Sequence, residues 1–179
     1  LGIWGAISLG AFAAFLFYKT HKTSLNFPYF LDALAPGVVI AQAIGRLGNW
    51  FNVELFGSPS TLPWALSVPK FDRPYGYAEF ATYHPTFLYE LLWCLLIAYL
   101  LIKLPGKFKK IVKNPGDLFA LYVVGYTSGR LWIEALRIDE ANHIFGLRLN
   151  IWVSILVLVG SVIYLLKSRA KSENESAAS

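Results

Sequence analysis

The sequence predicts an all-α protein: a polytopic transmembrane helical bundle of about five spans with a proline-rich extracytoplasmic arm. Of the 179 residues, 56% are hydrophobic and only 15% are charged, whereas soluble domains carry about 25% charged residues. The apolar residues gather in five runs, each close to the roughly 20 residues that a helix needs to cross a bilayer. Helices are expected in these runs because lipid offers the backbone no hydrogen-bond partners.

The first and last of the five runs contain no charged residue. Arg46 lies near the far end of the second run, Glu90 lies in the first turn of the third, and Arg130 and Glu134 lie in the fourth. A charged side chain at this depth needs a partner, and ionisable groups within spans are functional by default. In chain order, the predicted spans cover residues 2–18, 31–51, 87–102, 118–136 and 149–166.

The distribution of basic residues predicts the orientation of the bundle. Ten of the sixteen Lys and Arg residues follow the first run, the third run or the last run, against four on the opposite side. Because basic loops stay in the cytoplasm, these three regions, including the C-terminus, are predicted to be cytoplasmic. Residues 1–170 then form a single transmembrane domain, and the polar residues 171–179 form a disordered cytoplasmic tail.

The segment 52–83 is the predicted arm, on the opposite side of the membrane. Its prolines prevent one regular helix, and its tryptophan and tyrosine residues suit the surface of a bilayer, where such side chains settle. A plain extracytoplasmic loop is an equally good interpretation of this segment.

The net charge of +5 and the single cysteine narrow the classes of function. A nucleic-acid-binding protein would cluster its basic residues among exposed aromatic side chains. Here they separate apolar runs, so no nucleic-acid partner is expected. Cys94 excludes an internal disulfide, and a lone thiol inside an apolar run is expected to pack rather than to react.

The two arginines within spans are predicted to lie at the same depth. Arg46 follows Asp32 by 14 residues and Arg130 follows Asp117 by 13, and each aspartate marks the cytoplasmic start of a span. At 1.5 Å per residue, both guanidinium groups stand roughly 20 Å into a hydrocarbon core of about 30 Å. They can therefore meet at one lipid headgroup, whose phosphate would be a suitable partner.

The fourth span has a polar face, because Tyr126, Arg130 and Glu134 are spaced four residues apart. The alternative to a functional site is that these charges only neutralise one another and hold the helices together. Gly125 and Gly129 lie on the same span, and their spacing is also typical of close helix packing.

The run 45–57 (GRLGNWFNVELFG) brings polar groups to the outer end of the second span. Asn49 lies one turn after Arg46 and offers a donor and an acceptor to a phosphate or ester oxygen. Glu54 follows just past the expected end of the helix. His84 stands at the outer end of the third span, where it is either a general base or an ordinary histidine at a helix start.

Four motifs follow one another along the chain: GRLGNWFNVELFG (45–57), YHPTFLYE (83–90), PGD (115–117) and GYTSGRLWIEALRID (125–139). In this order they resemble the bacterial prolipoprotein diacylglyceryl transferases. The resemblance implies a multi-pass enzyme of the bacterial cytoplasmic (inner) membrane with its active site toward the outer face. Such an enzyme moves diacylglyceryl from phosphatidylglycerol to the thiol of the lipobox cysteine in a prolipoprotein signal peptide. It releases glycerol phosphate, begins lipoprotein maturation and uses no metal or organic cofactor.

The resemblance also implies roles for single residues. Arg46 and Arg130 would stabilise the charge that develops on the leaving phosphate, and Glu54 and Glu134 would orient a guanidinium group or the substrate. These four residues are the predicted catalytic set. The predicted substrate-binding set is Arg46, Asn49, Gly57, His84, Tyr126 and Arg130.

The chain departs from the family pattern at its start. Leu1 matches the last residue of a family motif, so the family's first spans and the expected general base are predicted to precede these residues. The 179 residues alone are therefore expected to be inactive. The alternative functions are a fragment of an anion channel or transporter, with polar stripes along whole helices, and a non-catalytic membrane assembly subunit.

Overall fold

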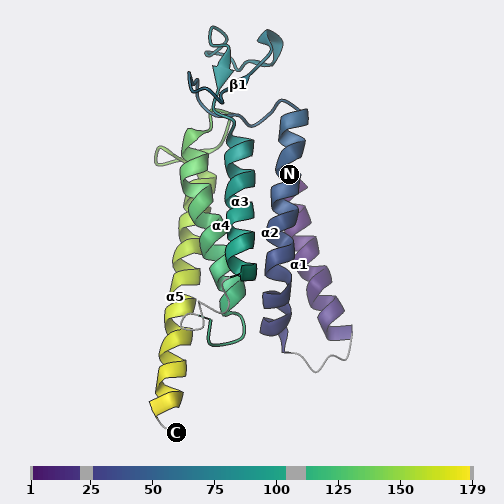
Figure 1. Cartoon of the computed structure of the whole chain (residues 1–179), viewed down its shortest axis with the longest axis vertical. Helices are drawn as coiled ribbons and strands as arrows, with labels where there is room; N and C mark the ends of the chain where they lie inside the picture. The colour runs from purple at the N-terminus through teal and green to yellow at the C-terminus, as the bar shows by residue number, and fades with distance from the viewer. Residues whose placement is uncertain (1, 21–25, 104–111, 178–179) are drawn as a thin grey trace.

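The computed structural model describes residues 2–20, 26–103 and 112–177 and is mainly helical. The helices run roughly along one direction, and the segment with β1 lies at the opposite end from the C-terminus (Figure 1). Within the described ranges the helices are α1 (Gly2–Thr20), α2 (Phe27–Phe51), α3 (Thr86–Lys103), α4 (Asp117–Leu136) and α5 (Leu149–Ala177). The same ranges contain the two-residue strands β1 (Leu66–Ser67), β2 (Thr82–Tyr83), β3 (His143–Ile144) and β4 (Leu147–Arg148).

The core lies where α2, α3 and α4 pack on one another, with α5 against α4. The buried face of α2 carries Ala35, Val39 and Ala43, spaced four residues apart. These residues belong to the same buried cluster as Cys94 and Ala98 of α3. Small side chains at this spacing allow helix backbones to approach closely. Cys94 is fully buried, so it packs as its position in an apolar run predicts.

Two glycines of α4 make its contact with α3 possible. A Cβ atom on Gly129 would lie 2.2 Å from Nε1 of Trp93, and one on Gly125 would lie 3.2 Å from Ile97. The indole Nε1 of Trp93 donates a hydrogen bond of 2.9 Å to the carbonyl oxygen of Gly125. The packing interpretation of these two glycines is therefore confirmed.

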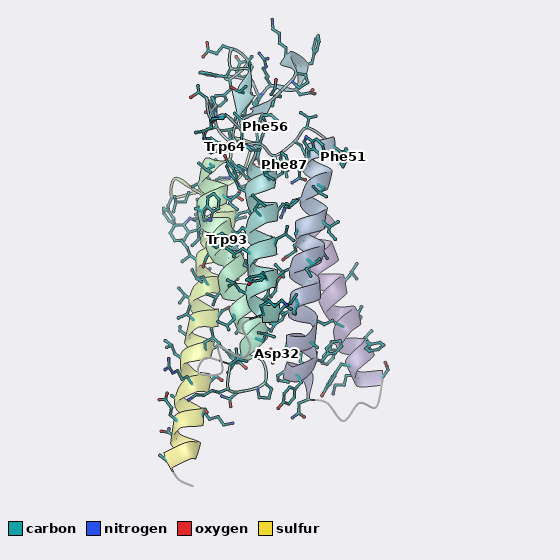
Figure 2. All side chains as sticks on the ribbon, in the orientation of Figure 1. Asp32, Phe51, Phe56, Trp64, Phe87 and Trp93 are labelled. Atoms are coloured by element: carbon teal, nitrogen blue, oxygen red, sulfur yellow. The ribbon has the colours of Figure 1, made fainter. Side chains whose placement is uncertain are left out.

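At the other end of the bundle, carboxylates fix the start of α4. Asp32 of α2 accepts hydrogen bonds of 2.7 and 2.8 Å from the backbone N–H groups of Gly116 and Phe119. Asp117 accepts one of 2.6 Å from the hydroxyl of Ser168 on α5. Asp32 is labelled in Figure 2, far from the end with Phe56. These bonds satisfy N–H groups that a helix start leaves without partners, and they tie α4 to both neighbouring helices.

Three of the helices, α2, α3 and α5, are long and apolar enough to cross a membrane by length and composition. The five predicted apolar segments thus form five helices, of which three in the described part of the chain meet the criterion for a span. α2 begins at Phe27, earlier than predicted, with a proline in its first turn, where proline is well tolerated.

The prediction of a disordered tail over residues 171–179 is wrong as far as Ala177, because α5 continues as a helix to that residue. Arg169 contacts Glu173 at 3.2 Å, one turn further along the helix. Lys113 also approaches Glu173, at 3.8 Å. The Arg169–Glu173 pair supports the exposed helix by a few tenths of a kcal/mol, which the low apolar content of the tail does not reveal.

The all-α prediction also needs correction in the connections. β1 pairs with β2, with Leu66 opposite Tyr83, and β3 pairs with β4. Segment 52–83 folds around its own small cluster of Phe56, Val68 and Tyr83. The hydroxyl of Tyr83 donates to the carbonyl oxygen of Tyr77 at 2.7 Å. The segment is therefore a compact unit at one end of the bundle (Figure 1).

Candidate active site

Side chains from three helices meet in the half of the bundle nearer segment 52–83. Arg46 of α2 and Arg130 of α4 contact the same oxygen of Glu90 of α3. Arg46 Nη2 lies 2.6 Å and Arg130 Nη1 lies 3.0 Å from Glu90 Oε1. We refer to Arg46, Glu90 and Arg130 as the arginine centre. The two arginines come together as their spacing along the sequence predicts, but a carboxylate of the chain itself joins them.

The arginine centre is largely removed from solvent. The Glu90 side chain is 5% exposed, and those of Arg46 and Arg130 are 17% and 13% exposed. Arg46 Nη2 also donates a hydrogen bond of 3.4 Å to the hydroxyl of Tyr126. Charges interact more strongly here than in bulk water because the effective dielectric constant is lower. The position therefore favours a ligand that carries negative charge.

Glu134, one turn after Arg130 on α4, divides its two oxygens between partners. Oε2 accepts a hydrogen bond of 2.5 Å from Arg130 Nη2. Oε1 accepts bonds of 2.8 Å from Arg148 Nε and 3.1 Å from Asn150 Nδ2. The Glu134 side chain is 1% exposed, so its charge is balanced by these neighbours and not by water.

Beyond Glu134, a second carboxylate anchors the chain after α4. Asp139 accepts bonds of 2.7 and 2.9 Å from Arg137 and one of 2.9 Å from Arg148 Nη2. Burial acts to raise the pKa of Asp139. The hydrogen bonds and charges of Arg137 and Arg148 outweigh it and hold this pKa below its ordinary value.

Two of the predicted site residues that make no contact with the arginine centre, Asn49 and Glu54, lie at or just past the end of α2. Glu54 is exposed, and its carboxylate accepts a hydrogen bond of 3.1 Å from Asn52. Among the described residues Glu54 contacts no guanidinium group, because the chain turns sharply here, with positive φ at Val53 and Leu55. Its predicted role in orienting a guanidinium group or the substrate stays a prediction. Asn49 is half-buried one turn from Arg46, and no partner of its side-chain amide occurs among the described residues.

Gly57 and His84 lie together where segment 52–83 meets the helix ends. The N–H of Gly57 donates 2.8 Å to the carbonyl oxygen of His84, and a Cβ on Gly57 would lie 2.9 Å from His84 Cβ. Close packing alone therefore requires glycine at this position. His84 Nδ1 lies 3.1 Å from the hydroxyl of Tyr89, which accepts a bond of 3.0 Å from Trp64 Nε1.

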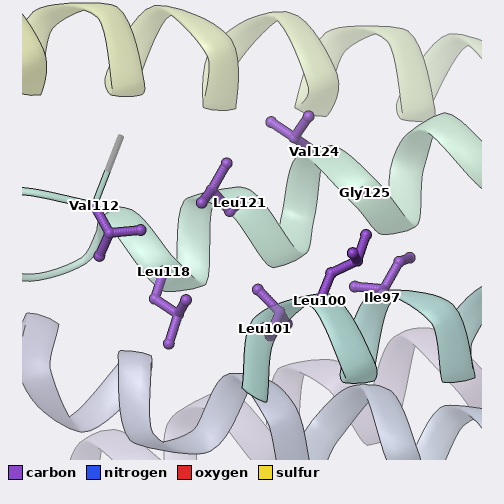
Figure 3. Close-up of a pocket in the computed structure, with 8 residues that line it drawn as sticks. All are labelled: Ile97, Leu100, Leu101, Val112, Leu118, Leu121, Val124 and Gly125. Atoms are coloured by element: carbon purple, nitrogen blue, oxygen red, sulfur yellow. The ribbon is translucent and has the colours of Figure 1, made fainter. Parts of the chain in front are cut away.

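An apolar cavity of about 210 Å³ lies between α3 and α4. It is lined by Ile97, Leu100, Leu101, Val112, Leu118, Leu121, Val124 and Gly125 (Figure 3). Its lining suits hydrocarbon. Among the residues that the structure describes, no group of three His, Cys, Asp or Glu side chains is arranged to hold a metal ion.

Three residues of the site were not predicted. Glu90 is the one carboxylate in the third apolar run, and that isolation is the signal that could have placed it at the centre. Arg148 and Asn150 stand outside every motif, next to the start of the last span. Nothing in their spacing indicates that they contact Glu134, because a turn of unpredicted geometry precedes them.

A helical, membrane-embedded protein with buried arginines that share carboxylates in one half of the bundle is the class that the fold and site define. Residues 1–167 match the family described as prolipoprotein diacylglyceryl transferase, and the chain belongs to this family. The resemblance of the four sequence motifs is thereby confirmed.

Several bacterial relatives are similar over nearly the whole chain. Phosphatidylglycerol–prolipoprotein diacylglyceryl transferase 2 of Streptomyces coelicolor is 53% identical over 168 residues, which cover 94% of this chain and 51% of that protein. The corresponding enzyme of Cutibacterium acnes is 49% identical, over 93% of this chain and 54% of its own length. That of Corynebacterium glutamicum is 48% identical, over 98% and 58%. The chain spans about half the length of the curated relatives it matches.

Proposed function

We propose that this protein transfers diacylglyceryl from phosphatidylglycerol to the thiol of the lipobox cysteine in a prolipoprotein signal peptide. The observation that carries the proposal is the arginine centre, where Arg46 and Arg130 share one oxygen of Glu90. The names of the relatives, which specify this donor lipid and a prolipoprotein, support it. The reaction is the first step of lipoprotein maturation.

The transfer replaces an ester oxygen by sulfur. The thiolate attacks the carbon of the diacylglyceryl unit that is bonded to the phosphate oxygen. A carbon–sulfur bond forms there, and the bond from this carbon to the phosphate oxygen breaks. The electron pair of that bond leaves on the phosphate oxygen. A base or the departing phosphate takes the thiol proton, so the products are diacylglyceryl-cysteine and glycerol phosphate. Negative charge on the phosphate therefore grows in the transition state.

Two guanidinium groups at the phosphate would stabilise this growing charge, which is the kind of interaction that lowers a barrier most. Both contacts that Arg46 makes in the described residues use Nη2, so Nε and Nη1 are available to phosphate oxygens. The Asn49 amide, one turn away, would add a donor. Tyr126 and Glu134 would hold Arg46 and Arg130, respectively, in place.

The remaining predicted residues, His84, Gly57 and Glu54, lie around the end of segment 52–83 and the end of α2. The Tyr89 hydroxyl accepts a hydrogen bond from Trp64 Nε1, so its own O–H can be donated to His84 Nδ1. In that tautomer of His84, Nδ1 is the acceptor and Nε2 carries the proton. This arrangement suits His84 as a donor to a substrate oxygen. Gly57 would shape the wall beside His84, and Glu54, exposed at the end of α2, would contact substrate and not an arginine.

We further propose that α1 and α4 complete a five-span bundle of residues 1–170 in the inner membrane of a bacterium. The arginine centre would lie toward the outer face, with the C-terminus in the cytoplasm. The distribution of basic residues supports this orientation. Segment 52–83, with its exposed Phe71 and Tyr75, would rest on the outer surface as a proline-rich arm. The cavity between α3 and α4 would accept part of an acyl chain.

The test is transfer from phosphatidylglycerol to a lipobox peptide by the full-length protein, measured for Arg46→Ala and Arg130→Ala with the folded yield of each in detergent. Removing one donor to a developing charge typically slows a reaction by about 100-fold or more. We therefore expect both variants to be at least that much slower, and we expect both to fold. Arg73→Ala is the control, because the hydrogen bonds that Arg73 makes within the described residues go to backbone carbonyl oxygens of its own loop.

Full activity of both variants would remove the arginines from the mechanism. Loss of folded protein in both, but not in the control, would instead favour a non-catalytic assembly subunit held together by ion pairs. An anion channel is disfavoured by the apolar lining between α3 and α4 (Figure 3). A conducting path would continue the polar residues along the helices.

A further inference from the structure

Arg148 is a buried charge that the proposed reaction does not use directly. It is the last residue of β4 and is 7% exposed. Its Nε donates 2.8 Å to Glu134 Oε1, while Nη2 donates 2.9 Å to Asp139 Oδ2 and Nη1 donates 2.8 Å to the Asp139 carbonyl oxygen. One guanidinium thus faces Glu134 on one side and Asp139 on the other.

The hairpin of β3 and β4 holds Arg148 in this position. Its turn runs through Phe145 and Gly146, both with positive φ, and places Arg148 opposite His143. Trp152 of α5 donates a bond of 2.9 Å from Nε1 to the carbonyl oxygen of Ile144. The hairpin is therefore fixed to the first turns of α5, and Arg148 approaches Glu134 from the side away from Arg130.

Among the charged side chains that contact one another here, arginines outnumber carboxylates. Four arginines (Arg46, Arg130, Arg137 and Arg148) face three carboxylates (Glu90, Glu134 and Asp139). One positive charge therefore remains in excess. Without Arg148, the group would be neutral. Among the described residues, Arg130 at 2.5 Å would then be the one close cation left to Glu134, because Arg137 lies 3.8 Å away.

We propose that Arg148 is a positioning residue that neutralises Glu134 and thereby leaves the charge of Arg130 available to the substrate phosphate. The inference rests on the proposed function. Arg130 lies between two carboxylates, Glu90 and Glu134. In surroundings of low dielectric constant, the negative charge of an uncompensated Glu134 would attract the Arg130 guanidinium. It would also offset the positive field that Arg130 exerts on the phosphate. Arg148 supplies the compensation without touching the substrate.

The test compares kcat and KM for phosphatidylglycerol in the intact protein, per mole of folded enzyme in mixed micelles. Arg148→Gln should lower kcat about tenfold, less than loss of a direct donor to the phosphate, because the effect passes through Glu134. KM should change less than kcat because the charge on the phosphate increases during the reaction. Arg148→Lys keeps the charge and should retain at least about a third of kcat.

The decisive variant is Arg148→Gln combined with Asp139→Asn. Removing Asp139 restores the excess positive charge and frees Arg137, already 3.8 Å from Glu134, to take over its neutralisation. The double variant should therefore recover kcat to within about threefold of the unsubstituted protein. If Arg148 only anchors the hairpin, the double variant loses two anchors and must be worse than the single one.

Each remaining outcome also either supports or overturns the proposed role of Arg148. If the single variant fails to fold and the double variant folds with near-normal kcat, the charge-balance role is supported. Unaltered kcat in Arg148→Gln, or a double variant that is slower or unfolded, overturns the role. The matched control is Arg73→Gln, and an equal loss there would assign the effect to surface charge. No transfer by the unsubstituted full-length protein would refute the proposed function itself, together with this role.

Discussion

Replacing Glu90 by glutamine tests the arginine centre most directly, because the change removes one charge and almost no volume. The two arginine nitrogens lie 2.6 and 3.0 Å from one oxygen of Glu90, so they are at most about 5.6 Å apart. Two unit charges at that separation repel by about 3 kcal/mol at an effective dielectric constant of about 20. The carboxylate now offsets this repulsion, and an amide would not.

We expect Glu90→Gln to lower the midpoint of thermal unfolding by about 6–12 °C, since 1 kcal/mol corresponds to about 2–4 °C in a protein of this size. The measurement is thermal unfolding of purified protein in nanodiscs. Glu79→Gln is the control, because Glu79 is exposed and makes no ion pair with any residue that the structure describes.

The same variant also distinguishes a phosphate clamp from a purely structural ion pair. With Glu90 neutral, an anionic headgroup should replace it between the arginines, so phosphatidylglycerol should stabilise the variant more than the unsubstituted protein, relative to phosphatidylcholine. An unfolding midpoint that does not move would refute the role of Glu90 in joining the arginines. A loss of stability that is identical in both lipids would refute the clamp.

Three further substitutions test the packing and the ion pairs that hold the elements around the site in place. Gly129→Ala places a Cβ 2.2 Å from Trp93 and should destabilise the protein by about 1–3 kcal/mol in thermal unfolding, whereas Gly160→Ala, with no atom within 4 Å, should not. Asp32→Ala leaves two backbone N–H groups at the start of α4 without an acceptor and should speed hydrogen exchange in that turn. The lowered pKa of Asp139 in the folded protein implies stability that is present above about pH 4 and lost as pH falls through the folded pKa. Asp139→Asn should therefore weaken the acid dependence of the unfolding midpoint.

The helices could be predicted because their apolar runs are long and uninterrupted, but their ends depend on contacts between segments. α2 starts at Phe27, where this ring packs on Phe15 and Tyr18 of α1. α5 continues past the apolar run, with Arg169 and Glu173 paired on its surface. The two-residue strands are too short to produce an alternating pattern, so the hairpins were not predicted.

The site was predictable to the extent that helix geometry alone determines it. The spacing of Arg130 and Glu134 brings them together on any helix, and the depth of Arg46 follows from the length of α2. Partners on other elements depend on how the helices rotate about their axes, which spacing does not determine. Glu90 and Arg148 were missed as site residues for this reason.

The balance of charge separates the two interpretations that the sequence leaves open. A set of ion pairs that only holds helices together is most stable when its charges cancel, because an unpaired buried charge is costly. The arginine centre instead leaves two guanidinium groups on one carboxylate, and Arg148 prevents Glu134 from completing the cancellation. A fold that retains this excess charge loses stability unless an anion binds there. The excess is therefore better explained by a site for a phosphate group than by a requirement of helix packing.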